Sequence, residues 1–139
     1  MRIHIYCFFV LSIVMSNAAL ADSSSPKLAA YYDRHMAIVS GVGYAWTGRD
    51  PPAKVVIDVK QVGVGRDAYY ALLKNGNLVL FQSPNDQHRV LMENVAKFSA
   101  GQSGVLVITT DHVLWWLDGA TRKYVADDVA TAAVGDQTV

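Results

Sequence analysis

Histidine is the side chain best suited to acid–base or metal chemistry near neutral pH. The chain has four, and His35, His88 and His112 follow its apolar N-terminal stretch. They show none of the ligand spacing of a zinc site, and the acidic pair at 127–128 lacks the alternating oxygen ligands and the glycine of a calcium loop. We interpret His88 and His112 as solvated turn residues and predict no metal site.

Serine and glycine motifs also argue against catalysis. Ser99 and Ser103 do not belong to a G-x-S-x-G nucleophile elbow. The glycine pairs at 41–43 and 63–65 share part of a nucleotide-binding pattern, but no third glycine opens a helix after either pair. We predict no catalytic residue and no cofactor, and we expect that the protein is not an enzyme.

Two pairs of adjacent aromatic residues, Tyr69–Tyr70 and Trp115–Trp116, are the remaining candidates for binding chemistry. Neighbouring residues of a strand face opposite sides of the sheet, so the two members of a pair have different surroundings. We assign Trp116 to packing between sheets. Trp115, Tyr69 and Tyr70 have two interpretations: burial against a neighbouring sheet, or exposure to solvent, where the ring stacks on a sugar or a protein partner.

The charge balance argues against nucleic acid as a partner. The chain has 12 Lys and Arg residues and 12 Asp and Glu residues, so its formal net charge is zero. Binding to a phosphate backbone depends on a clustered basic surface, whose counterion release supplies most of the affinity. We expect no such surface here.

Residues 1–21 have the pattern of a cleaved signal peptide. Arg2 precedes a continuous apolar run, and Ala19 and Ala21 form an A-x-A cleavage motif before Asp22. The apolar core of about a dozen residues is shorter than the roughly 20 that a membrane span requires. We predict cleavage between Ala21 and Asp22, with no stable membrane span afterwards.

Removal of this segment also removes the only cysteine, Cys7. The remaining chain, 22–139, then has no thiol for a disulfide, a metal site or a nucleophile. A small exported domain without disulfides suggests a bacterial envelope, so we predict a periplasmic or secreted protein.

A repeat of about 35 residues is the most informative pattern in the chain. The aligned pairs in its two best copies are Val59 with Val95, Gly65 with Gly101, Leu72 with Ile108, and Phe81 with Trp116. The sequences VVIDV, LMENV and VADDV stand at the boundaries of the copies, each with two apolar residues at its start and an Asp or Asn directly before its final valine. We mark copies at about 24–58, 59–94 and 95–128, with the start of a fourth at 129–139.

Each copy is predicted to form four short strands, because β-branched and aromatic runs alternate with turn residues and no long helical period follows residue 21. Asn75–Gly76 is the strongest hairpin signal and predicts a type I′ turn, with positive φ at both residues. Four strands per unit match a propeller blade. We predict an all-β fold of β-propeller type over 22–139, with roughly three blades plus the start of a fourth. The small residues at 63–65 fit a first strand close to the central channel.

The repeat resembles that of the regulator of chromosome condensation family. The residues that carry the resemblance are Val59, Val62, Gly65, Ala71, Leu72, Gly76 and Phe81, together with Tyr44, Trp46 and Gly48. In that family seven such units close a propeller, and a His follows the first Gly; this chain lacks that His and has about three units. The resemblance implies a scaffold for binding, and it does not carry over the nucleotide-exchange activity of the founding member, because no motif matches its site.

We therefore expect an exported, non-catalytic binding or scaffold module that recognises a protein. Two alternatives remain open: a carbohydrate-binding, lectin-like propeller, and a fragment of a propeller enzyme. Three blades leave two unmatched ends with unpaired strand edges. We expect either a truncated propeller or a protomer that completes its ring by self-association through these open blade edges.

The signal peptide is tested by the N terminus of the exported protein. We expect a mature chain that begins at Asp22, and Ala19→Arg is expected to block processing because the peptidase pocket takes small side chains. Mass spectrometry of the secreted or periplasmic product checks both statements. A product that retains residues 1–21 contradicts them.

Overall fold

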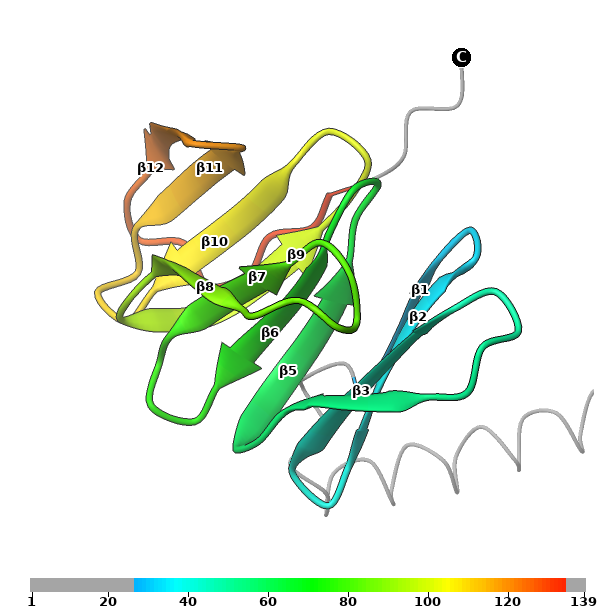
Figure 1. Cartoon of the computed structure of the whole chain (residues 1–139). Helices are drawn as coiled ribbons and strands as arrows, with labels where there is room; N and C mark the ends of the chain where they lie inside the picture. The colour runs from blue at the N-terminus through cyan, green and yellow to red at the C-terminus, as the bar shows by residue number, and fades with distance from the viewer. Residues whose placement is uncertain (1–26, 135–139) are drawn as a thin grey trace, which may run out of the picture.

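The computed structural model describes residues 27–134, which form twelve strands and no helix (Figure 1). The strands are β1 (Leu28–Tyr31), β2 (Arg34–Val39), β3 (Val42–Thr47), β4 (Ala53–Val56), β5 (Val59–Val64), β6 (Tyr69–Leu73), β7 (Leu78–Phe81), β8 (Arg89–Met92), β9 (Val95–Ala100), β10 (Val105–Thr109), β11 (Leu114–Asp118) and β12 (Thr121–Ala126). No helix within 27–134 could cross a membrane.

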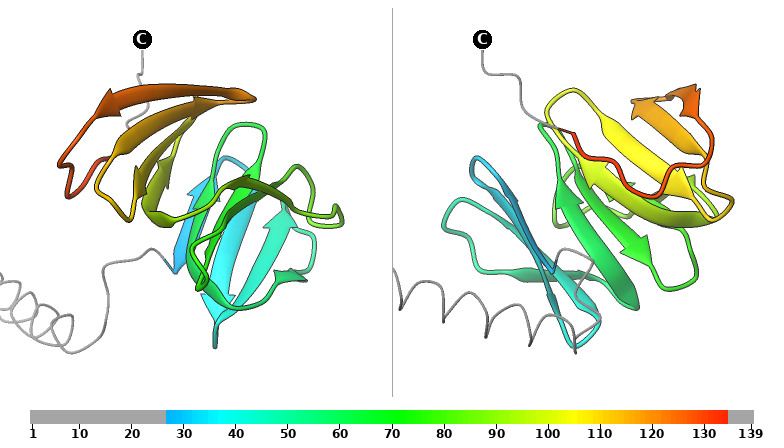
Figure 2. Two further views of the ribbon diagram at one scale, coloured as in Figure 1. Left: turned by 90° about the vertical axis from the view of Figure 1, so that its left-hand side faces the viewer. Right: turned by 180° about the vertical axis from the view of Figure 1, so that it is seen from behind.

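The strands form three four-stranded antiparallel sheets, each with its strands in sequence order. We name them blade 1 (β1–β4), blade 2 (β5–β8) and blade 3 (β9–β12); they fan out in succession in Figure 2. The prediction of an all-β fold built from propeller-type blades is confirmed. Each blade has a near face, toward the preceding blade, and a far face, toward the following one.

The core lies between the blades. One cluster joins the far face of blade 1 to the near face of blade 2, and a second joins the far face of blade 2 to the near face of blade 3. The first includes Met36, Ala45, Val62, Tyr69 and Phe81; the second includes Leu72, Leu78, Phe98, Val107 and Leu117. Blade 2 is buried on both faces, which explains why its strands are continuous apolar runs rather than alternating ones.

A repeated backbone corner joins each blade to the next. The residue before each new blade has a positive φ, and the following valine N–H donates to a carbonyl in the preceding blade's central hairpin. The bonds, with the positive-φ residue in parentheses, are Val59 to Gly41 (Asp58), Val95 to Gly76 (Asn94) and Val129 to His112 (Asp128), each 2.9 Å long.

The corner also bonds forward. The carbonyls of Asp58 and Asn94 accept from the N–H groups of Lys74 and Thr110, each at 2.8 Å. The corner residue therefore links the central hairpins of two consecutive blades. This geometry accounts for the repeated ending seen in VVIDV, LMENV and VADDV, since Asp and Asn tolerate the left-handed conformation better than most residues.

The predicted type I′ turn at Asn75–Gly76 is wrong. Only Gly76 has a positive φ, and the bonds from Leu73 N–H to the Asn77 carbonyl and from Gly76 N–H to the Leu73 carbonyl close a three-residue loop. The Asn75 side chain accepts from the Asn77 N–H at 3.0 Å, a local bond typical of turns. Positive φ at both turn residues occurs instead at Ser40–Gly41 in blade 1.

The first strands of blades 2 and 3 approach closely at glycines, as the small residues at 63–65 suggested. A Cβ atom at Gly63 would lie 2.5 Å from the Phe98 ring and 3.3 Å from the Ala100 Cβ. The buried Gln61 amide clamps the same pair of strands: its Nε2 donates to the Phe98 carbonyl, and its Oε1 accepts from the Phe98 N–H. The spacing between these blades therefore depends on the absence of a side chain at Gly63.

We expect Gly63→Ala to destabilise the protein by about 1–3 kcal/mol, because the new methyl group must displace a packed ring. Urea unfolding of a protein that comprises residues 22–139 measures the change. Lys60→Ala, at an exposed position of the same strand, is the matched control and is expected to stay within about 0.5 kcal/mol of the unsubstituted protein. Equal stability of the two variants would contradict the close approach of β5 and β9.

Candidate functional site

Tyr69 is a core residue. Its side chain is 1% exposed and its ring stacks on Phe81, with centroids 5.4 Å apart and planes 6° apart. Its hydroxyl lies 2.7 Å from the Thr47 Oγ1 and also donates to the Trp46 carbonyl, so it fastens blade 2 to blade 1. The interpretation of Tyr69 as a ligand-stacking residue is wrong, because blade 1 covers the ring.

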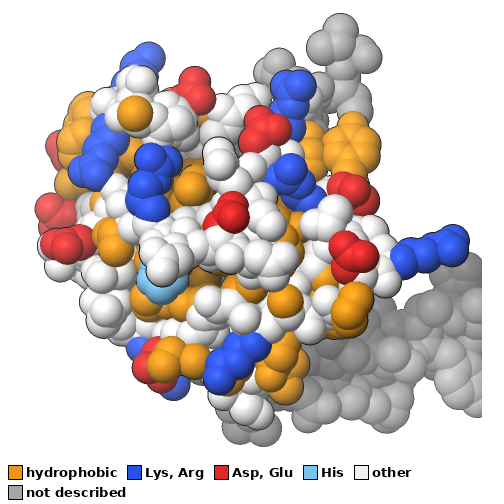
Figure 3. All heavy atoms as spheres, in the orientation of Figure 1, with side chains coloured by type: hydrophobic (Ala, Val, Ile, Leu, Met, Phe, Trp, Pro, Cys, Tyr) orange, Lys and Arg blue, Asp and Glu red, His pale blue; other side chains and the backbone are white. Residues whose placement is uncertain are grey.

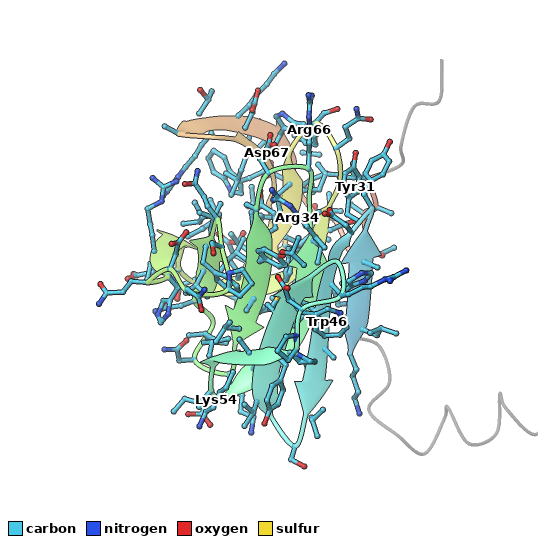
Figure 4. The ribbon with its side chains drawn as sticks, turned by 45° about the vertical axis from the view of Figure 1, so that its right-hand side comes forward. Tyr31, Arg34, Trp46, Lys54, Arg66 and Asp67 are labelled. Carbon is cyan, nitrogen blue, oxygen red and sulfur yellow. The ribbon has the colours of Figure 1, made fainter. Side chains whose placement is uncertain are left out.

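Tyr70 faces the opposite side of blade 2 and is half-buried against Phe98 of blade 3. Burial, with a smaller contribution from the nearby Asp67 carboxylate, raises the pKa of its phenol above the ordinary value of 10.0. The ring lines a cleft of about 230 Å³ at the end of the blades where Arg66 and Asp67 form the β5–β6 turn (Figure 4). Tyr70 remains a candidate for binding at this cleft.

The two tryptophans lie on opposite faces of blade 3, and Trp116 is not the counterpart of Phe81 that the sequence alignment suggested. The register of Tyr69 with Phe81 in blade 2 matches that of Val105 with Leu117 in blade 3, so Leu117 is the counterpart of Phe81. The alignment of Phe81 with Trp116 is therefore wrong by one residue, and a one-residue shift moves a side chain to the other face. Trp115 lies on the near face beside blade 2, and Trp116 lies on the far face.

Trp115 lines a groove of about 620 Å³ between blade 2 and blade 3, which we name groove 2. Its ring is half-buried, and it meets the Tyr124 ring in a T-shaped contact, with ring centroids 5.9 Å apart and planes at 85°. The lining residues are Val90, Leu91, Met92, Glu93, Asn94, Thr109, Thr110, Asp111, Val113, Trp115 and Arg122. Arg122 is held in place because its Nη2 donates to the Leu91 carbonyl at 2.5 Å.

A matching groove of about 560 Å³, which we name groove 1, lies between blade 1 and blade 2. Its lining residues are 54–58, 73–75 and His88, and the first two segments lie 36 positions before 90–94 and 109–111 of groove 2. The same parts of the repeat therefore build both grooves: the fourth strand with its corner, and the central hairpin of the next blade. The repeated endings VVIDV and LMENV were the sequence signal for these grooves.

The two grooves differ in chemistry at equivalent positions. Groove 1 has Ile57 and Lys74 where groove 2 has Glu93 and Thr110, and no aromatic side chain in groove 1 matches Trp115. Groove 1 is mainly apolar with basic residues at its margin, whereas groove 2 is polar with one aromatic wall. Figure 3 shows charges of both signs spread among hydrophobic side chains over one face of the molecule.

The three described histidines lie apart. His35 stacks on Trp46, with ring centroids 5.3 Å apart; His88 borders groove 1; and His112 has a positive φ in the β10–β11 hairpin. Within 27–134 no group of three or more His, Cys, Asp or Glu side chains could hold a metal ion. The predicted cleavage residues Ala21 and Asp22 lie outside the described residues.

Comparison with known proteins finds similarity in structure alone. No family model matches the sequence, and no curated protein does either. PorZ from Porphyromonas gingivalis matches with a TM-score of 0.61 and 12% identity, over 80% of this chain and 17% of PorZ.

Two further matches are the N-terminal domain of Nup159 and yeast RCC1 (Prp20). The first has a TM-score of 0.55 and 12% identity, over 74% of this chain and 30% of that domain. Yeast RCC1 has a TM-score of 0.54 and 18% identity, over 66% of this chain and 29% of that protein. These are β-propeller proteins, so the likeness shows the propeller fold. The chain spans less than a third of the length of each.

The buried phenol of Tyr70 predicts a loss of stability at high pH. Above pH 10 an unfolded tyrosine loses its proton, while Tyr70 in the folded protein keeps it because its pKa is raised. The folded state then binds more protons than the unfolded state, so the free energy of unfolding falls as pH rises through this range. We expect Tyr70→Phe to make that fall shallower, measured by urea unfolding at about pH 9 to 11. The same slope in both proteins would show that the phenol is solvated.

Proposed function

We propose that this protein is an exported, non-catalytic module that binds another protein through the grooves between its blades. The observation that carries the proposal is the repetition of one groove, with different linings, along the stack of three blades. Binding residues are often presented by loops on a rigid scaffold. Here each groove is lined by a hairpin, 73–75 in groove 1 and 109–111 in groove 2, and a backbone bond to the corner residue fixes each hairpin. These loops therefore need little ordering on binding.

The exposed apolar side chains support a protein as the partner. Ile57 is 56% exposed in groove 1 and Val90 is 47% exposed in groove 2, and charged residues such as Lys54 and Glu93 stand beside them. An apolar centre with a polar margin is the usual composition of a protein–protein interface.

The structural relatives are consistent with this role. PorZ is a bacterial surface component of the type-IX secretion system, yeast RCC1 is known in a complex with Kap60, and Prp20p binds Gsp1p and histones. These partners belong to those proteins. What supports the proposal for this chain is that propellers of this shape serve as binding scaffolds, and that residues 1–21 carry the pattern of an export signal.

Carbohydrate is the second candidate ligand, and Trp115 is the observation that favours it. In groove 2 this ring is accompanied by Glu93, Asp111 and Arg122. An aromatic face with charged groups at its edge suits a sugar ring, because apolar C–H groups pack on the ring while hydroxyls bond to the charged groups.

A set of groove variants tests both candidates. Mature protein 22–139 is immobilised and incubated with an envelope extract, beside Ile57→Asp for groove 1, Trp115→Ala for groove 2, and Tyr32→Ser as a fully folded control outside both grooves. We expect the parent protein and Tyr32→Ser to retain the same proteins, and at least one groove variant to lose them. A well-folded parent that retains nothing at any salt concentration contradicts the proposal.

The same proteins are applied to a glycan array. Binding that is lost in Trp115→Ala and kept in Ile57→Asp assigns groove 2 to a saccharide. Silence of the parent protein on the array, or unchanged binding by Trp115→Ala, removes carbohydrate as a candidate.

A further inference from the structure

Blade 1 and blade 2 each carry a stacked pair of ring side chains at equivalent positions of their near faces. His35 and Trp46 face each other across β2 and β3, and Tyr69 and Phe81 do so across β6 and β7. The ring centroids are 5.3 Å apart in the first pair and 5.4 Å in the second. Both pairs occupy the position from which a blade packs on its predecessor.

The surroundings of the two pairs differ. Tyr69 and Phe81 are buried, because the far face of blade 1 covers them and supplies hydrogen-bond partners. His35 and Trp46 are only half-buried, on the face of blade 1 opposite to that of Met36 and Ala45, which packs on blade 2. The same face carries Leu28, 69% exposed, at the strand position opposite Ala37. The near face of blade 1 is thus an apolar interface surface without a described blade against it.

The complementary surface lies at the other end of the stack. The far face of blade 3 carries Leu106, Ile108, Leu114 and Trp116, at the positions that Tyr70, Leu72, Leu78 and Leu80 hold in blade 2. In blade 2 those positions form the surface on which blade 3 packs. The first and last described blades therefore present the two halves of an interface that already occurs twice between the described blades.

Residues 129–134, which we name the strap, lie on part of this far face. Val129 donates to the His112 carbonyl as the first residue of each new blade does, Val134 donates to the Ser99 Oγ, and the Val134 side chain fills the space beside Gly101. The strap crosses β9 and β10 in the right-hand view of Figure 2. It takes the place of the first strand of a following blade, and Trp116 lies on the same face.

We infer that the near face of blade 1 docks on the far face of blade 3 of a second copy, and that the strap covers this site until the second copy displaces it. The contact continues the blade-to-blade interface of the chain, with Trp46 and His35 taking the part of Phe81 and Tyr69. The contact is head-to-tail, so each copy uses the near face of blade 1 in one contact and the far face of blade 3 in another. The inference does not depend on what binds in groove 1 or groove 2.

The strap is tested in the full mature chain by Val134→Asp, which places a carboxylate in the tight space beside Gly101 and is expected to release the strap. Sedimentation velocity over a concentration series is expected to show self-association at least about tenfold tighter than in the parent. A second variant, 22–128, removes the strap and is used if Val134→Asp unfolds; circular dichroism and urea unfolding establish which variant is folded. A folded, strap-free protein that stays monomeric overturns the inference.

Paired variants identify the surfaces that meet. In the Val134→Asp background we expect Trp46→Asp and Trp116→Asp each to abolish self-association, because each spoils one of the two faces. Mixed together, they retain one intact face of each kind and are expected to form a 1:1 complex that does not grow further.

Val90→Asp is the control, because Val90 is an exposed apolar residue that lies in groove 2 and on neither of the two faces proposed to meet. It is expected to leave the association unchanged. Association that survives Trp46→Asp, or a mixture that remains monomeric, shows that other surfaces are responsible and overturns the head-to-tail contact.

Discussion

Each blade of this protein has two apolar faces, and packing against a neighbouring blade is what removes most of this surface from water. Blade 2 meets that requirement on both sides, with Tyr69 and Phe81 packed on blade 1 and Leu72 and Leu78 packed on blade 3. The hydrophobic burial that stabilises a blade is therefore mostly burial between blades. Stability, the position of the grooves and the character of the end surfaces all follow from this stacking.

The backbone corner sets the geometry of the stack. A residue with positive φ, such as Asp58 or Asn94, turns the chain at each corner. The N–H of the next valine donates to the central hairpin of the preceding blade, and the carbonyl of the corner residue itself accepts from the central hairpin of the following blade. Because this corner recurs, the crevice beside it recurs too, and grooves 1 and 2 are built from equivalent segments. Binding chemistry can then vary at positions such as Ile57 and Glu93 without changing the scaffold.

Much of this architecture was predictable, because the constraints that produce it recur at a fixed spacing. Val59 and Val95 mark the corners, and Gly63 marks the close approach of two blades, where no side chain fits. The details that failed depend on single residues. The alignment of Phe81 with Trp116 is one position off, and in a β-strand one position changes the face. Likewise, Tyr69 and Tyr70 are adjacent in the sequence, yet the two faces of blade 2 give them different neighbours.

The sequence by itself determined the blades, because alternation, turn residues and repeat length are local properties that recur along the chain. It also determined which residue types stand at the corners, since few residues tolerate positive φ. Only the tertiary structure decided which side chains share a groove and which aromatic rings are covered. Those outcomes depend on contacts between separate segments of the chain, such as 54–58 with 73–75 in groove 1 and 90–94 with 109–111 in groove 2, and on the presence or absence of a neighbouring blade. The stacked pair of His35 and Trp46 shows the difference. The register of β2 and β3 brings the two rings together, but their exposure depends on whether another blade packs against them.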